Sequence, residues 1–140
     1  MEKFFDIKCR YSGLIPNAII LVATVRALKM HGGGPPVKPG SSFPKVYMDE
    51  NLDMLEKGCD SNLKKQIENS NKFGIPVVVA VNKFQSDTQS EIQLVLNKAK
   101  QYGAFQATEC NPWAKGGQGT KNLALAAVEA CKKPSNFTYF

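Results

Sequence analysis

The histidine and paired cysteine ligands of structural zinc sites are scarce in this sequence. Among 140 residues there is one histidine, and the four cysteines, Cys9, Cys59, Cys110 and Cys131, form no CxxC pair. A structural zinc site needs four such ligands at close spacing, so the sequence argues against one and no metal ligand is assigned. The cysteines are expected to be reduced thiols with structural roles.

Long hydrophobic runs and clusters of basic residues are also missing. The longest apolar run, Ala18–Ala23, is far shorter than the roughly 20 residues of a membrane-spanning helix, and no signal segment opens the chain. Lys and Arg outnumber Asp and Glu by 18 to 12, a net charge of +6, without forming a run. We therefore expect no membrane and no nucleic acid as partner, whereas small anions are compatible with the charge.

Two β-branched runs predict the strands of a parallel sheet. Residues 77–81 carry Val at four of five positions without polar alternation, which is typical of a strand covered on both faces. Ala18–Thr24 has the same pattern and is also expected to be doubly buried, and residues 104–110 predict a third, more exposed strand. Helical patterns between and after them complete an α/β fold with flanking helices and right-handed crossovers.

The expected helix boundaries follow from capping and breaking residues. Asp49 is the expected N-cap of a helix that Gly58 ends, and a second helix runs from Ser61 to a stop at residues 73–74. Asp87 or Thr88 caps a helix over 87–103, and the last helix ends before residue 134. The polar, basic segment 26–31 is interpreted as a strand end, and residues 1–12 as irregular.

Polar residues follow each predicted strand. The segments Thr24–His31, Asn82–Asp87 and Asn111–Gly119 would meet at one edge of a parallel sheet, where α/β proteins bind their ligands. Asn82-Lys83 followed by Asp87 resembles the base-reading NKxD motif of nucleotide-binding proteins, although the Asp comes two residues late. The phosphate-binding loop GxxxxGK[ST] occurs nowhere in the sequence, so a backbone cradle for a triphosphate is missing.

Trp113, the only tryptophan, lies in a loop of Pro, Lys and Gly residues. Its indole could stack on a flat heterocycle, or it could pack on the next loop. Gly116 and Gly117 indicate a mobile loop that a ligand can approach closely, or a plain turn.

The basic residues after the first strand have equally open roles. Arg26 and Lys29 could form structural ion pairs or bind phosphate. His31 is more typical of a turn residue bonded to a carbonyl than of a catalytic group.

Longer motifs resemble a known family. Val22–Gly33, with the sequence VATVRALKMHGG, is similar to a signature of formate–tetrahydrofolate ligase, also called 10-formyltetrahydrofolate synthetase, a domain of the animal C-1-tetrahydrofolate synthases. The resemblance continues, in order, through Glu2–Arg10, Asn62–Leu63, Gln66–Asn69, Phe73–Asn82 and Trp113–Gly117. Within the signature, the residues of functional interest are Arg26, Lys29, His31, Gly32 and Gly33.

The resemblance implies an ATP-dependent ligation within one-carbon metabolism. Formate is phosphorylated to formyl phosphate, and N10 of tetrahydrofolate then takes the formyl group, leaving ADP and phosphate. The implied fold is of the P-loop NTPase type. The implied ligands are formate, ATP, which carries Mg²⁺ in the full enzyme, and tetrahydrofolate with its polyglutamate tail.

The family also implies roles for individual residues. The pterin ring lies between aromatic side chains, which we carry over to Trp113 and Phe84. The nucleotide and folate pocket corresponds to Asn82, Asp87, Lys115, Gly116 and Gly117. This chain has Ser86-Asp87-Thr88 where the family commonly has Thr-Asp-Thr, and Lys83 is variable, so no catalytic residue is assigned.

The family domain is several times longer than this sequence, and its phosphate loop precedes the position of Met1. Residues 1–140 are therefore expected to be one partial domain that supplies the folate and nucleotide wall and is inactive alone. The alternative is a non-catalytic α/β binding or interaction module derived from that enzyme. A cytoplasmic or alternatively mitochondrial location, and a homodimer of the full enzyme, are the further expectations.

Overall fold

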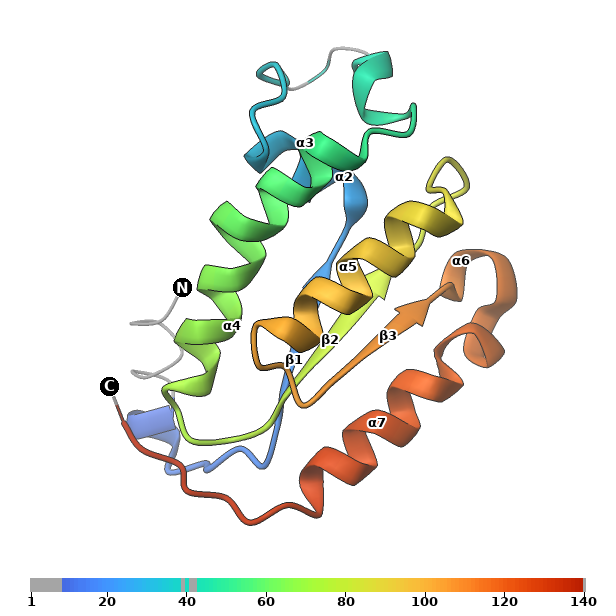
Figure 1. The fold of residues 1–140 in the computed structure, drawn as a ribbon. Coiled ribbons are helices and arrows are strands. Elements are labelled where there is room, and N and C mark those ends of the chain that lie inside the picture. The colour runs from blue at the N-terminus through green and yellow to red at the C-terminus, as the bar shows by residue number, and fades with distance from the viewer. Residues whose placement is uncertain (1–8, 39, 41–42, 140) are drawn as a thin grey trace.

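Three parallel strands form the sheet of the computed structural model, which describes residues 9–38, 40 and 43–139 (Figure 1). The strands β1 (Ile19–Ala23), β2 (Val77–Asn82) and β3 (Gln106–Cys110) lie in the order β1-β2-β3. Their register places Leu21 beside Val79, and Val79 beside Ala107. The predicted α/β fold with a parallel sheet is confirmed, whereas its relation to P-loop NTPases stays a prediction.

Helices cover both faces of this sheet. The larger core lies between the sheet and helices α2 (Val25–His31), α3 (Leu52–Gly58), α4 (Lys64–Asn71) and α5 (Gln89–Gln101). On the opposite face α7 (Lys121–Cys131) packs Ala126 and Ala130 on Val78. The remaining elements are the short helices η1 (Lys45–Tyr47), η2 (Cys59–Leu63), α6 (Pro112–Lys115) and η3 (Gly116–Thr120).

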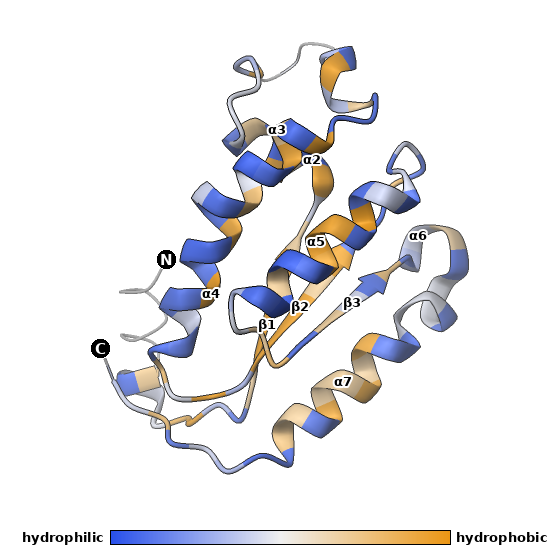
Figure 2. Ribbon diagram, viewed as in Figure 1, coloured by the Kyte–Doolittle hydropathy of each residue, from blue (hydrophilic) through white to orange (hydrophobic). Residues whose placement is uncertain are grey.

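β2 is the centre of the structure, as its run of valines predicts. All residues from Val77 to Val81 are buried. Val79 and Val81 face the larger core, while Val78 faces α7. Figure 2 shows the same arrangement, with hydrophobic residues along β1 and β2 and polar residues on the outer sides of the helices.

The prediction that β1 is buried on both faces is wrong. Leu21 and Ala23 face the larger core, but Ile20 and Val22 are 47% and 63% exposed. β1 pairs only with β2 among the described strands, and α7 contacts β2 and β3. A short apolar run is compatible with either a central or an edge strand, so the sequence pattern alone could not distinguish them.

Residues 26–31 form helix α2 and not a strand end. Thr24 has extended backbone angles, and its side chain accepts a hydrogen bond from Ala27 N at 3.2 Å, which caps the helix. Val25, Leu28 and Lys29 form the buried stripe. Because one member of that stripe is a lysine, the apolar period that marks a helix was too weak to be recognised.

The predicted start of α3 is also wrong, and its end differs in character from a helix stop. Asn51, and not Asp49, is the N-cap, since its side chain accepts a hydrogen bond from Met54 N at 2.9 Å. The α-helix ends at Gly58, as predicted, but the chain does not leave the helical path there, because it continues through the π-helical turn η2 into α4. The predicted end of this second helix near residues 73–74 is confirmed by the end of α4 at Asn71 and the turn that follows it.

Gly58 and Gly32 are needed where α2 and α3 touch. Gly58 has ordinary helical angles, yet a methyl group on it would overlap the carbonyl oxygen of Leu28. A methyl group on Gly32 would overlap the carbonyl oxygen of Met54 in the same way. The signature glycine Gly32 therefore has a packing role in this structure: the two helices approach backbone to backbone.

We expect Gly58→Ala to lower the melting temperature by several degrees. Overpacking typically costs about 1–3 kcal/mol, whereas the better helix propensity of alanine returns at most about 1 kcal/mol. Thermal unfolding followed by circular dichroism measures the change. Gly117→Ala is the matched control, because a methyl group there meets no atom within 4 Å. Equal melting temperatures for wild type and Gly58→Ala would show that α2 and α3 can separate without cost.

The four cysteines are free thiols. Cys9, Cys59 and Cys110 are buried, and Cys131 is exposed. Burial raises the pKa of the Cys59 thiol to about 12, so this thiol is inert at neutral pH.

Some expectations fall on residues outside the described part. Of the segment 1–12, predicted to be irregular, residues 1–8 lie outside it and residues 9–12 are helical. Positions 39, 41 and 42, which precede η1, also lie outside. Within the described residues, the structure has no helix long and apolar enough to span a membrane.

Candidate functional site

The carboxyl ends of the three strands lie at one edge of the sheet, as predicted (Figure 1). β1 leads into α2, β2 into the segment before α5, and β3 into α6. The parallel register brings Asn82 beside Cys110, so the segments that follow β2 and β3 start next to each other.

Phe84 and Trp113 line the same pocket at this edge. The pocket has a volume of about 590 Å³ and is lined by Asn82, Lys83, Phe84, Pro112 and Trp113. This volume lies within the range of sites for small organic ligands. Trp113 is 95% exposed, so it does not anchor a neighbouring loop, and Phe84 is 38% exposed. Two large aromatic side chains are therefore open to a ligand.

A short helix presents Trp113. Asn111 caps α6 by accepting a hydrogen bond from Ala114 N at 3.2 Å, and Pro112 begins the helix, where a missing N–H costs nothing. The chain then turns back through η3, and Asn111 N donates to Gly119 O at 3.0 Å. Of the mobile loop and the plain turn left open for this segment, the structure shows a turn, of helical form.

Lys115, Gly116 and Gly117 follow Trp113 on this turn but do not line the pocket. All three are exposed, and Gly116 has a positive φ of 54°. They follow Trp113 by two to four residues in the sequence.

Asp87 stabilises the turn that carries Phe84. Its carboxylate accepts a hydrogen bond from Phe84 N at 2.8 Å, and Asp87 N donates to Phe84 O at 3.1 Å. The side chain is buried and is not part of the pocket lining. Burial raises the pKa of Asp87, an effect that the Phe84 hydrogen bond and the charge of Arg26 partly offset. Asp87 therefore stabilises the backbone of Phe84, a residue of the pocket lining, without lining the pocket itself. The similarity to an NKxD motif does not extend to the position of Asp87.

Thr88 starts α5 directly after this turn. Its hydroxyl accepts from Glu91 N, and the Glu91 carboxylate accepts from Thr88 N at 3.2 Å, which completes a capping box. Of the two predicted caps, Thr88 is confirmed.

Arg26 connects the signature segment to the pocket. Its guanidinium carbon lies 4.5 Å from the centroid of the Phe84 ring, and its Nη2 donates to Ser86 Oγ at 3.0 Å. Sequence reasoning placed both residues at the same sheet edge but did not predict that they touch.

Lys29 forms a buried ion pair with Glu91, and both side chains are almost completely inaccessible to solvent. Lys29 Nζ also donates to Asp49 O at 2.8 Å. Of the two roles left open for Lys29, the structure supports the ion pair. Glu91, which sequence reasoning did not single out, became recognisable only through this contact.

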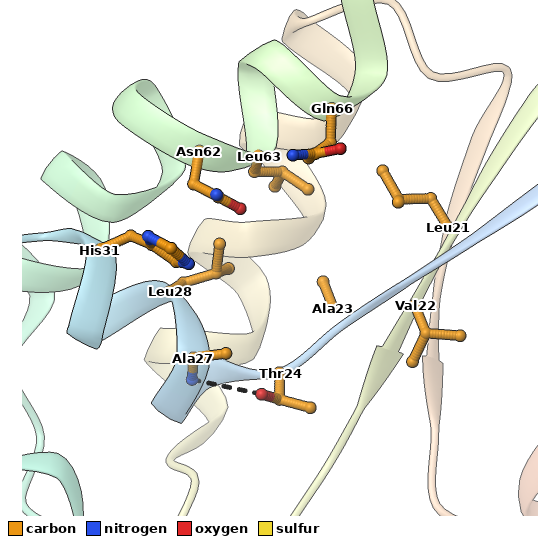
Figure 3. A pocket seen from close by; sticks show the side chains of 10 residues that line it. All are labelled: Leu21, Val22, Ala23, Thr24, Ala27, Leu28, His31, Asn62, Leu63 and Gln66. Atoms are coloured by element: carbon orange, nitrogen blue, oxygen red, sulfur yellow. Dashed lines mark hydrogen bonds between the residues drawn. The ribbon is translucent and has the colours of Figure 1, made fainter. Parts of the chain in front are cut away.

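His31 lies in a second, smaller pocket of about 230 Å³. Figure 3 shows the side chains of His31 and Asn62 extending into it from α2 and η2. The pocket shares no residue with the Phe84–Trp113 pocket. Its lining consists of Leu21, Val22, Ala23, Thr24, Ala27, Leu28, His31, Asn62, Leu63 and Gln66. The remaining signature residue, Gly33, has a positive φ of 98° in the turn after α2.

Residues 9–38, 40 and 43–139 contain no group of three His, Cys, Asp or Glu side chains that could hold a metal ion.

A parallel α/β sheet with an aromatic-lined pocket beyond its strand ends is an arrangement found in nucleotide- and cofactor-dependent enzymes. The family model described as formate–tetrahydrofolate ligase matches residues 1–140. The chain belongs to the formate–tetrahydrofolate ligase family.

Similar proteins come from animals and fungi. The cytoplasmic C-1-tetrahydrofolate synthase of Homo sapiens is 60% identical over 137 residues, which cover 98% of this chain and 14% of that protein. The mitochondrial C-1-tetrahydrofolate synthase of Saccharomyces cerevisiae is 57% identical over 138 residues, with 99% and 14% covered. The cytoplasmic C-1-tetrahydrofolate synthase of Spodoptera frugiperda is 56% identical over 139 residues, with 99% and 15% covered. The chain thus spans about one seventh of these relatives (14–15%).

Proposed function

We propose that residues 1–140 form part of a formate–tetrahydrofolate ligase domain and supply the wall that binds the pterin ring of tetrahydrofolate. One observation carries this proposal: Phe84 and Trp113, the two residues that the family resemblance assigns to the pterin, line one pocket. They come from different strand ends, so their meeting does not follow from sequence proximity.

The chemistry of the pocket fits a pterin. A flat heterocycle can stack on the two exposed rings, which favours binding through burial and through aromatic contacts. Asn82, also in the lining, offers an amide donor and an amide acceptor to the polar edge of such a ring.

The polyanionic parts of the ligands fit the surrounding charge. Polyglutamate and ATP are both anionic, and the chain has a net charge of +6. Lys115, Gly116 and Gly117, on the turn that follows Trp113, are proposed to contact the nucleotide. Asp87 is proposed to act through the Phe84 turn, because its carboxylate already accepts the Phe84 N–H.

The proposed reaction of the complete enzyme joins formate to tetrahydrofolate at the expense of ATP, through formyl phosphate, with Mg²⁺ accompanying the nucleotide. Since the sequence contains no GxxxxGK[ST] loop, the proposal assigns ligand binding to these residues and not phosphoryl transfer. A homodimer and a cytoplasmic or mitochondrial location belong to the same proposal; relatives carry both compartment names.

We expect Trp113→Ala to weaken tetrahydrofolate binding several-fold to some hundred-fold. Losing a stacking partner costs about 0.5–1.5 kcal/mol beyond the lost burial, and each 1.4 kcal/mol is tenfold in affinity. Isothermal titration calorimetry of this chain with tetrahydrofolate measures the change. Phe84→Ala should have a similar effect, and the double variant should lose less than the sum because the two rings act on one ligand.

Tyr11→Ala is the matched control, since Tyr11 is exposed and lies outside the pocket lining. ATP affinity should change far less than folate affinity in all variants. Equal folate affinity in wild type and Trp113→Ala would exclude the pterin role of Trp113. No saturable folate binding by wild type would favour the alternative, a non-catalytic interaction module.

A further inference from the structure

The Phe84 ring is in contact with a planar cation. The guanidinium carbon of Arg26 lies 4.5 Å from the ring centroid of Phe84, and 5.8 Å from that of Phe43. Guanidinium groups are attracted to the faces of aromatic rings, and their planar shape covers a ring face closely. Phe84 also lines the pocket, so its ring lies between Arg26 and the space for a ligand.

Both ends of this contact are anchored. Arg26 belongs to α2, the helix that the buried Lys29–Glu91 pair connects to α5. Its Nη2 donates to Ser86 Oγ at 3.0 Å, two residues beyond Phe84. The backbone of Phe84 is bonded to the Asp87 carboxylate. The Arg26 guanidinium therefore contacts the turn at two points, the Phe84 ring and the Ser86 hydroxyl.

One hydrogen-bond donor of the Arg26 guanidinium is unpaired within the described part of the chain. Its Nε is buried and has no hydrogen-bond partner among the described residues. A buried N–H without a partner is unfavourable, so the contacts that keep the guanidinium in this position compensate for it. The contacts with the Phe84 and Phe43 rings and the bond to Ser86 contribute to this compensation.

We propose that Arg26 is a positioning residue that holds the Phe84 ring in the orientation required for stacking on the ligand. This inference rests on the proposed function, because it takes the Phe84–Trp113 pocket as the pterin site. It adds a specific role for the signature arginine, which touches the ring and is absent from the pocket lining.

Removal of the guanidinium should free the ring to adopt other rotamers, which the ligand must then order on binding. The ordering of one side chain at an interface lowers affinity roughly two- to tenfold. Arg26→Met keeps an unbranched apolar side chain without the planar cation. Arg26→Lys keeps the charge but loses the plane and the fork, so it should restore little of the affinity.

A double-mutant cycle with tetrahydrofolate as the probe tests the inference. Affinities are measured by calorimetry for wild type, Arg26→Met, Phe84→Leu and the double variant, with Arg26→Lys as a second substitution. We expect Arg26→Met to weaken binding roughly two- to tenfold when Phe84 is present and to have no further effect in the Phe84→Leu background. A general loss of stability would lower affinity by the same factor in both backgrounds.

A ligand-free measurement accompanies the cycle. Protons above a ring face are shifted upfield, so the side-chain protons of Arg26 should show a ring-current shift by NMR that disappears in Phe84→Leu. Absence of that shift, or equal effects of Arg26→Met in both backgrounds, would overturn the positioning role while leaving folate binding by wild type intact. Absence of folate binding by wild type would instead overturn the proposed function and this extension of it.

Discussion

Val79→Asp is expected to leave most of the chain unfolded at 25 °C. Val79 is fully buried at the centre of β2, with β1 and β3 on either side and the larger core against its side chain. An isolated carboxylate there has no partner and cannot reach water. The expected cost is at least about 4–5 kcal/mol, which approaches the whole stability of many domains.

Circular dichroism and chemical denaturation measure this effect, and the structure supplies a matched control. Val22→Asp introduces the same change in the neighbouring strand, but Val22 is 63% exposed, so the carboxylate stays hydrated. We expect the control to cost less than about 1 kcal/mol. Similar stabilities of the two variants would mean that β2 is not the buried central strand.

Lys29→Met should be the next most damaging substitution, at about 3–5 kcal/mol. Glu91 would remain buried with its charge uncompensated, and loss of one partner of a buried ion pair typically has this cost. The carboxylate would keep only its hydrogen bonds from Asn51 N, at 3.1 Å, and Thr88 N, at 3.2 Å. Denaturation of wild type and variant at pH 7 gives the difference.

Two further variants separate the buried charge from other causes. Adding Glu91→Gln to Lys29→Met should recover part of the lost stability, because the amide is neutral and can still accept a backbone N–H. Lys98→Met is the control, since Lys98 pairs with Glu56 at 2.6 Å and Asp60 at 3.3 Å, both about half exposed. Exposed pairs contribute about 0–1 kcal/mol. If Lys98→Met were as damaging as Lys29→Met, burial would not be the reason for the effect.

Local patterns predicted the centre of the fold and the outline of the site. The valines of residues 77–81 are sufficient to identify a buried strand, and the strand–helix alternation is sufficient to predict a parallel sheet. Since parallel strands end at one edge, the convergence of Asn82, Phe84 and Trp113 followed from topology together with the family resemblance. These features depend on residues that are close in sequence or on a general rule of sheet geometry.

The features that the sequence did not predict depend on distant partners. Lys29 can lie on the buried face of α2 only because Glu91 neutralises its charge. Gly58 looks like a helix stop, but it is required by the backbone of Leu28 on another helix. Asp87 was assigned to the pocket because of its position after β2, whereas its carboxylate turns back to the Phe84 N–H. In each case the deciding contact lies outside the local pattern.

Because Trp113 is exposed and lines the pocket, its fluorescence reports selectively on that pocket. The emission of an indole depends on the polarity around it, and this one is already 95% in solvent in the folded chain. It is also the only tryptophan, so no buried indole contributes to the signal. Tryptophan fluorescence therefore distinguishes an occupied from an empty pocket, while it is nearly blind to melting of the core around β2.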